Sequence, residues 1–162
     1  MRKLLFVVCS VLLTASLSMA QGKIDSRWNC AKATTENAID VGDVPNHSYS
    51  ISQGPCTATE GTIEGVKEKD GKGIQLIETT GASSTWHGVF METLANGDKI
   101  NFKFTGSGTD KDGKFATGSD KWTIASGTGK LKGAKGSGTC AGKGGADGSV
   151  SWTCTGTYTL AK

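Results

Sequence analysis

The chain is 162 residues long, contains 24 glycines against 2 prolines, and has a formal net charge of +3. Every glycine follows residue 20, but the glycines show no Gly-X-Y period and lie among threonine and aromatic residues. This pattern excludes collagen and a flexible Gly/Ser linker, and the length fits one domain.

The first twenty residues have the order of a secretory signal peptide. Arg2 and Lys3 precede an apolar run over 4–17, and Ser18-Met19-Ala20 follows. We therefore expect cleavage after residue 20, no membrane span in the mature chain, and a secreted or periplasmic location. Loss of Arg2 and Lys3 lowers the formal net charge from +3 to +1. So small a charge gives no reason to expect a nucleic-acid partner.

The next segment, residues 21–46, is polar and only weakly periodic. We expect it to be an N-terminal arm, with one or two helical turns over 31–38. The rest of the chain, 47–162, is expected to form a single domain. Pro45 and Pro55 bracket the first strand that the pattern predicts.

From residue 47 onward, short alternating segments are separated by turn residues. Four Asp-Gly or Asn-Gly pairs, which are typical of β-hairpin turns, divide the segments. Period-two alternation predicts about eight strands, at 48–53, 57–64, 73–80, 85–95, 98–106, 119–125, 130–141 and 149–160. No stretch of helical period competes with them. The fold class is therefore all-β, with the strands closed into an antiparallel β-barrel, because closure removes exposed strand edges.

One predicted hairpin has two registers. If Asn96-Gly97 is a two-residue turn, Met91 shares a face with Phe102 of the next strand; if 95–97 is a three-residue loop, Glu92 does so instead. A slip of one residue exchanges the two faces of a strand. The sequence therefore leaves open which face of 85–95 points inward.

The four cysteines after residue 20 predict two disulfides. An even number of cysteines in an exported chain is typical of disulfides, and four cysteines allow three pairings. Cys140 and Cys154 lie symmetrically about Asp147 of a turn, so a hairpin there would place them opposite each other. Cys30 with Cys56 follows by elimination. A zinc site is the rival hypothesis, but it lacks any Cys-x-x-Cys pair.

Residues 127–136, Gly-Thr-Gly-Lys-Leu-Lys-Gly-Ala-Lys-Gly, form the most distinctive segment. It resembles a Gly-x-Gly-(x)-aromatic/Leu-x-Gly-Ala-x-Gly stretch in the barrels of dirigent proteins and allene oxide cyclases. Asn96-Gly97-Asp98-Lys99 and Gly156-Thr157-Tyr158 are similar to that group too, and the mature chain looks like small secreted bacterial proteins of this type. The resemblance implies an eight-stranded antiparallel barrel, often oligomeric, with a cavity for hydrophobic molecules. The sequence leaves open whether this chain forms homo-oligomers.

Candidate binding residues lie on one predicted strand: Trp86, His87, Phe90 and Glu92. They combine bulky rings with a titratable imidazole and a carboxylate, and barrel mouths can form apolar pockets with a few polar groups. The competing hypothesis is that the aromatic side chains simply fill the lumen, because eight-stranded barrels leave little internal space.

Motifs for cofactors and catalysis are missing from the sequence. Gly142-Lys143 does not complete a phosphate-binding loop, and two histidines are too few to hold zinc alone. No Gly-x-Ser-x-Gly elbow is present. We therefore expect no cofactor and no metal. The sequence favours a non-catalytic binding or structural module, with a small hydrophobic molecule as the candidate ligand. The alternative, implied by the resemblance alone, is a cyclase-like or dirigent-like enzyme acting on a small hydrophobic intermediate.

Overall fold

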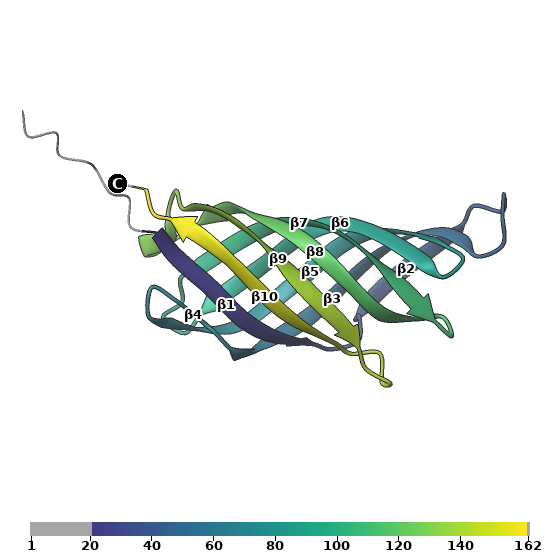
Figure 1. Cartoon of the computed structure of the whole chain (residues 1–162), viewed down its shortest axis with the longest axis horizontal. Helices are drawn as coiled ribbons and strands as arrows, with labels where there is room; N and C mark the ends of the chain where they lie inside the picture. Colours follow the sequence, from purple (N-terminus) through teal and green to yellow (C-terminus); the bar gives the residue numbers. More distant parts are fainter. Residues whose placement is uncertain (1–20, 162) are drawn as a thin grey trace, which may run out of the picture.

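A computed structural model describes residues 21–161, and most of them lie in β-strands (Figure 1). The signal peptide predicted for residues 1–20 lies outside the described residues. The strands are β1 (Gln21–Cys30), β2 (Thr35–Asp40), β3 (His47–Glu60), β4 (Thr62–Ile63), β5 (Val66–Thr80), β6 (Ser83–Leu94), β7 (Lys99–Lys111), β8 (Lys114–Gly127), β9 (Lys135–Gly144) and β10 (Val150–Thr159). One turn of 3-10 helix, η1 (Gly129–Leu131), joins β8 to β9.

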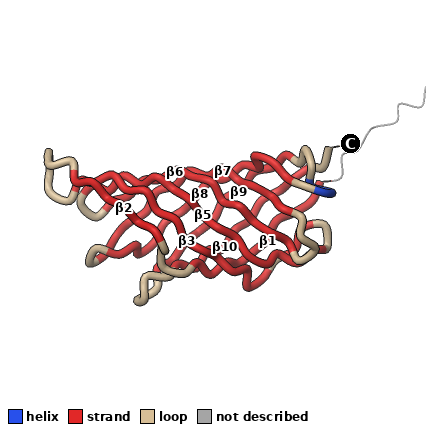
Figure 2. The backbone as a smooth tube through the Cα atoms, turned by 180° about the vertical axis from the view of Figure 1, so that it is seen from behind, coloured by secondary structure: helices blue, strands red, loops and turns tan. Residues whose placement is uncertain are grey.

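The strands close into an antiparallel barrel. Its neighbours run in the order β1, β10, β9, β8, β7, β6, β5 and β3, and pairing between β3 and β1 completes a ring of eight strands. The all-β class and the eight-stranded barrel predicted from the alternation are therefore confirmed. Figure 2 shows the barrel from behind, with long tilted strands joined mostly by short turns.

The N-terminal segment differs from the prediction. β1 is a barrel strand between β10 and β3, and β2 continues along the same edge of β3, so the arm expected over 21–46 and the helical turns expected over 31–38 are wrong. In β1 the inward Ser26 interrupts the apolar alternation of Ile24 and Trp28. All 6 residues of β2 are exposed, so this strand forms by backbone pairing and shows no amphipathic pattern.

The break predicted between strands at Pro55 is also wrong, because β3 runs through it. Pro55 pairs with Lys72 of β5, and its carbonyl accepts a bond from the Ala31 N–H. Ala31 belongs to the irregular link between β1 and β2. In an antiparallel strand the N–H side of a residue is also the side of its carbonyl, so the missing proline N–H faces the irregular link and the ladder between β3 and β5 is unaffected.

The register between β6 and β7 decides which residues face the lumen. Phe90 pairs with Phe102, and the Leu94 N–H donates to the Asp98 carbonyl across a three-residue loop, 95–97. Gly97 adopts a φ of 88°, which an L side chain rarely tolerates. Of the two predicted registers, the one with the three-residue loop forms.

One end of the barrel is packed shut. Ile63 of β4, Leu94 of β6, Ile100 of β7 and Leu131 of η1 are fully buried and belong to one apolar cluster. β4 lies at this end in Figure 1. Burial of each such side chain stabilises the fold by roughly 1.5–3 kcal/mol. We call this the closed end, and the end with the turns at 41–46, 81–82, 112–113 and 145–149 the open end.

Two disulfides link neighbouring strands. Cys30 of β1 is bonded to Cys56 of β3, and Cys140 of β9 is bonded to Cys154 of β10; each pair is directly opposite in the sheet register. Both predicted pairings are confirmed. Each cross-link limits the unfolded chain, which typically adds ~2–4 kcal/mol of stability.

Candidate functional site

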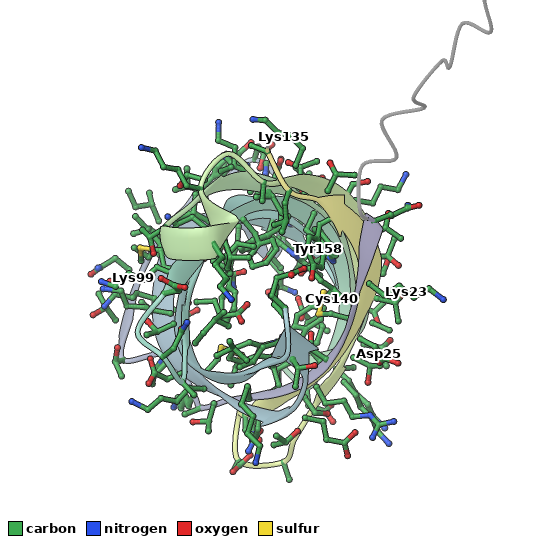
Figure 3. All side chains as sticks on the ribbon, turned by 90° about the vertical axis from the view of Figure 1, so that its left-hand side faces the viewer. Lys23, Asp25, Lys99, Lys135, Cys140 and Tyr158 are labelled. Carbon is green, nitrogen blue, oxygen red and sulfur yellow. A yellow bond between two sulfur atoms is a disulfide. The ribbon has the colours of Figure 1, made fainter. Side chains whose placement is uncertain are left out.

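A cavity of about 1040 Å³ occupies the barrel lumen. It extends from the open-end turns, represented by Gly81 and Gly113, down to Glu92 of β6. The fully buried residues of the closed end do not line it. In the view along the barrel, Tyr158 and Cys140 lie on the inner face, whereas the labelled lysines and Asp25 lie on the outer face (Figure 3).

Eight aromatic side chains line the cavity: Trp28, Trp86, Phe90, Phe102, Phe104, Phe115, Trp122 and Trp152. Several hold one another edge-on. Trp28 and Phe90 have ring centroids 4.9 Å apart, and Trp86 lies 5.7 Å from Phe115. Edge-to-face pairs of this kind add ~0.5–1.5 kcal/mol beyond burial and fix ring orientation. The walls are therefore rigid and apolar.

Glycines on the inner face keep the lumen open. A Cβ at Gly142 of β9 would lie 2.5–2.7 Å from three ring atoms of Trp152, and one at Gly118 of β8 would lie 2.7 Å from the Trp86 ring. These positions accept the flat face of an indole only because they have no side chain. The tryptophans therefore lie along the wall and do not cross the lumen, so the hypothesis that aromatic residues fill the barrel is wrong for this end.

A carboxylate lies among these rings. The Trp86 Nε1–H donates to Oδ1 of Asp120 on β8 at 2.5 Å. Burial raises the pKa of Asp120 to about 6, and the bond from Trp86 opposes that shift. Asp120 is therefore mostly ionised at neutral pH, and it lines the cavity. The lumen thus holds a negative charge beside an indole ring.

The floor of the cavity holds a second type of acid. Glu92 is 3% exposed, and its Oε1 has no hydrogen-bond partner among residues 21–161. Burial, together with the nearby Glu68, raises the pKa of Glu92 to about 9. Burial also raises the pKa of Glu68 to about 7, while the Ser26 hydroxyl acts in the opposite direction without forming a well-aligned hydrogen bond. Glu92 therefore keeps its proton at neutral pH.

The structure unites three of the four predicted site residues. Trp86, Phe90 and Glu92 line the cavity together. His87 is exposed on the outer face of β6, opposite Leu76 and Thr105, and takes no part in the site.

Sequence reasoning missed Asp120 and Trp122, which also line the cavity. Their spacing of two within one strand, beside the alternating Ile124, was the available signal. It also missed Trp28, because β1 was assigned to an arm. The Trp122 Nε1–H is a further buried donor without a partner in the described part of the chain.

Within residues 21–161, no three His, Cys, Asp or Glu side chains lie where they could hold a metal ion together. Over the same described range, none of the helical structure is long and apolar enough to cross a membrane.

Comparisons with known proteins place the fold. No family model matches the chain, and no curated protein matches it. Among solved structures, the pterocarpan synthase dirigent protein PsPTS1 is similar at 12% identity with a TM-score of 0.50, covering 88% of this chain and 97% of that one. The pterocarpan synthase dirigent protein GePTS1 is 12% identical with a TM-score of 0.49, covering 97% of this chain and 98% of that one. The chain therefore has a dirigent-like β-barrel fold, as its 127–136 segment predicts.

Proposed function

We propose that this protein is an exported β-barrel module that binds a small, largely apolar molecule in its lumen without transforming it. The observation that carries the proposal is the cavity of about 1040 Å³ with aromatic walls. Ligand pockets typically span ~300–1,000 Å³ and combine apolar walls with a few polar groups. Asp120, Glu92 and Trp122 supply such polar groups.

The rigidity of the barrel favours binding. Each Å² of apolar ligand surface removed from water contributes ~25 cal/mol, but ordering side chains on binding offsets part of this gain. Here the rings of Trp28 and Phe90 already hold each other at 4.9 Å, and two disulfides cross-link the wall. Little order remains to be gained when a ligand enters.

Export is supported by the redox chemistry of the chain. Disulfides persist in oxidising compartments and are rare in the cytosol. Cys30–Cys56 and Cys140–Cys154 agree with the signal peptide predicted for residues 1–20. Intact mass measurement on protein from its source should give a chain that begins at Gln21 with four hydrogens fewer than the reduced form.

Lumen binding can be tested with N-phenyl-1-naphthylamine, a neutral dye whose fluorescence rises in apolar surroundings. A Cβ at Gly73 of β5 would meet only Phe90, at 4.0 Å, so a side chain there fits the wall and extends into the cavity. We expect the wild type to bind the dye and Gly73→Leu to bind it at least about tenfold more weakly, because the leucine occupies ligand volume. Lys72→Leu, on the outer face of the same strand, is the matched control and should bind normally. Equal binding by all three proteins would contradict the proposal.

Glu92 favours a second candidate function, a cyclase-like or dirigent-like enzyme acting on a hydrophobic intermediate. A carboxylic acid that stays protonated in an apolar cavity can donate a proton to a bound substrate. Incubation of hydrophobic extracts with the wild type and with Glu92→Gln, followed by chromatography and mass spectrometry, separates the two functions. A product that forms only with the wild type would identify an enzyme. Unchanged extracts together with retained dye binding would support the non-catalytic binding module.

A further inference from the structure

We propose that the lumen selects a protonated amine carried on a flat apolar body, with the Asp120 carboxylate as its counter-ion. This inference rests on the proposed lumen binding and names the class of ligand.

The lumen is acidic although the chain is basic. The whole chain has 18 lysines and arginines against 15 acidic residues. Lys32 and Lys114 are the basic residues on the cavity wall, whereas the acidic ones are Glu36, Asp40, Glu92, Asp110, Asp112 and Asp120. Lys114 is held at the rim, where its Nζ donates to the Ala146 carbonyl at 3.0 Å. An anionic ligand would therefore enter against an excess of like charge, whereas a cation would be attracted.

Asp120 gives a cation a specific partner. Its Oδ1 accepts the Trp86 N–H, while its Oδ2 has no side-chain donor among residues 21–161. The Trp86 ring also contacts Phe115 and Trp152, with centroids 5.7 Å and 6.4 Å away. An ammonium group at Oδ2 would thus lie beside the Trp86 indole that bonds Oδ1. Cations within ~6 Å of a ring centroid are attracted to its face, and more strongly when they are desolvated.

Glu92 is an independent indication that the cavity accepts a polar ligand group. Glu92 lines the cavity and is only 3% exposed, and its Oε1 has no hydrogen-bond partner in the described chain. A buried acceptor without a donor is unfavourable. An N–H or O–H on the far end of the ligand would satisfy it. The cavity therefore offers a charged acceptor in its aromatic part and a second acceptor at its floor.

Three naphthalene probes that differ only in their polar group test the proposal. At pH 7.5, 1-naphthylmethylamine is a cation, 1-naphthylmethanol is neutral and 1-naphthylacetate is an anion. Calorimetry or displacement of N-phenyl-1-naphthylamine gives their affinities. We expect the amine to bind about tenfold more tightly than the alcohol, and the acid to bind most weakly, because a hydrogen bond between opposite charges is stronger than one between neutral groups.

Asp120→Asn is the decisive variant, because it removes the charge and keeps an acceptor for the Trp86 N–H. It should bring the affinity of the amine down to that of the alcohol and leave the alcohol unchanged. Asp120→Glu, which keeps the charge, should retain the preference. Asp25→Asn is the control for net charge, since Asp25 lies on the outer face of β1 (Figure 3).

The outcomes separate this inference from the proposed function. If none of the probes binds, lumen binding itself is wrong. If the alcohol binds as tightly as the amine to the wild type, lumen binding stands and amine selection is overturned. If the amine preference survives in a folded Asp120→Asn, Asp120 is not the counter-ion and the assignment is overturned. The comparison of the three probes on the wild type needs no variant. It can therefore overturn amine selection even if Asp120→Asn does not fold.

Discussion

The two halves of the barrel follow the same alternating pattern but use their inner positions differently. At the closed end, Ile100 and Leu94 extend into the lumen and pack against side chains from β4 and η1. In the open half, Trp152 and Trp86 lie flat over glycines of the neighbouring strands. Both halves have the same strands, so strand number does not set the internal volume. The internal volume depends instead on the residue against which each large inward side chain packs.

The largest expected effect comes from the closed end. Ile100→Ala should lower the free energy of unfolding by about 2–5 kcal/mol, because the surrounding apolar cluster cannot collapse into the space. Binding of N-phenyl-1-naphthylamine should stay unchanged while the protein is folded, since Ile100 does not line the cavity. Urea titration measures the first effect and dye titration the second. Val89→Ala, on the outer face of β6, should change stability by less than about 0.5 kcal/mol. Loss of dye binding in folded Ile100→Ala would show that the halves are not separate.

A glycine of the open half should give a smaller loss of stability and a larger loss of binding. In Gly142→Val the new side chain overlaps the Trp152 ring, which has to leave the wall and move into the lumen. We expect a loss of about 1–3 kcal/mol, typical of overpacking, and dye binding weakened severalfold. Ala141→Val adds similar bulk at the neighbouring outward position and should lower neither stability nor dye affinity. Normal dye affinity in Gly142→Val would contradict the role assigned to the glycines.

The regions of these two variants also show which features of the fold could be predicted from the sequence. Alternation in β6 to β10 was strong enough to predict the barrel, and the symmetry of Cys140 and Cys154 predicted their bond. The glycine excess was visible as well, but its packing role depends on which strands are neighbours, because each indole lies over a glycine of another strand. The strand β2 had no signal, since it buries no side chain.

The acid pair at the cavity floor shows a different limit. Glu92 could be predicted as an inward candidate, whereas Glu68 could not. A register shift between Glu68 and Asp70 lies in β5, and beyond it Gly71 and Gly73 alternate inward. Such a bulge moves a side chain to the other face, and nothing in the local sequence marks it. The raised pKa of Glu92 follows mainly from burial and secondly from the nearby Glu68.

Glu92 gives the third prediction, a pH dependence of stability. Its pKa is raised to about 9 in the folded state, above the ordinary value near 4.5. The unfolded chain therefore releases the proton first, and stability falls as pH rises from about 4.5 to 9. Glu92→Gln should flatten this fall by roughly 2–3 kcal/mol between pH 6 and pH 8. Urea titrations at pH 6, 7 and 8 measure it. A slope that is the same in both proteins would place the titrating group elsewhere.

The smallest effect belongs to the open end, where His47 of β3 joins the 41–46 loop to β5. Its Nδ1 lies 2.6 Å from Asp43 Oδ1, and its Nε2 lies 3.3 Å from Glu78 Oε1. The bond to Asp43 raises the pKa of His47 above its ordinary 6.5, and Glu78 adds to this. A raised histidine pKa means that the stabilising contribution is complete below pH 6.5 and disappears as pH rises through the folded value.

We therefore expect amide exchange in the 41–46 loop to quicken relative to the closed end as pH passes through the folded pKa of His47, after correction for intrinsic exchange. The effect should be local, because the imidazole anchors a loop and not the apolar cluster. His47→Gln should remove the dependence and leave N-phenyl-1-naphthylamine binding intact. Proton NMR can follow the imidazole directly: the chain has 2 histidines, so His87→Gln assigns both signals. A His47 signal that titrates below 6.5 would show that the two carboxylates do not hold the ring, and the open end would then lack the pH-dependent anchor that distinguishes it from the closed end.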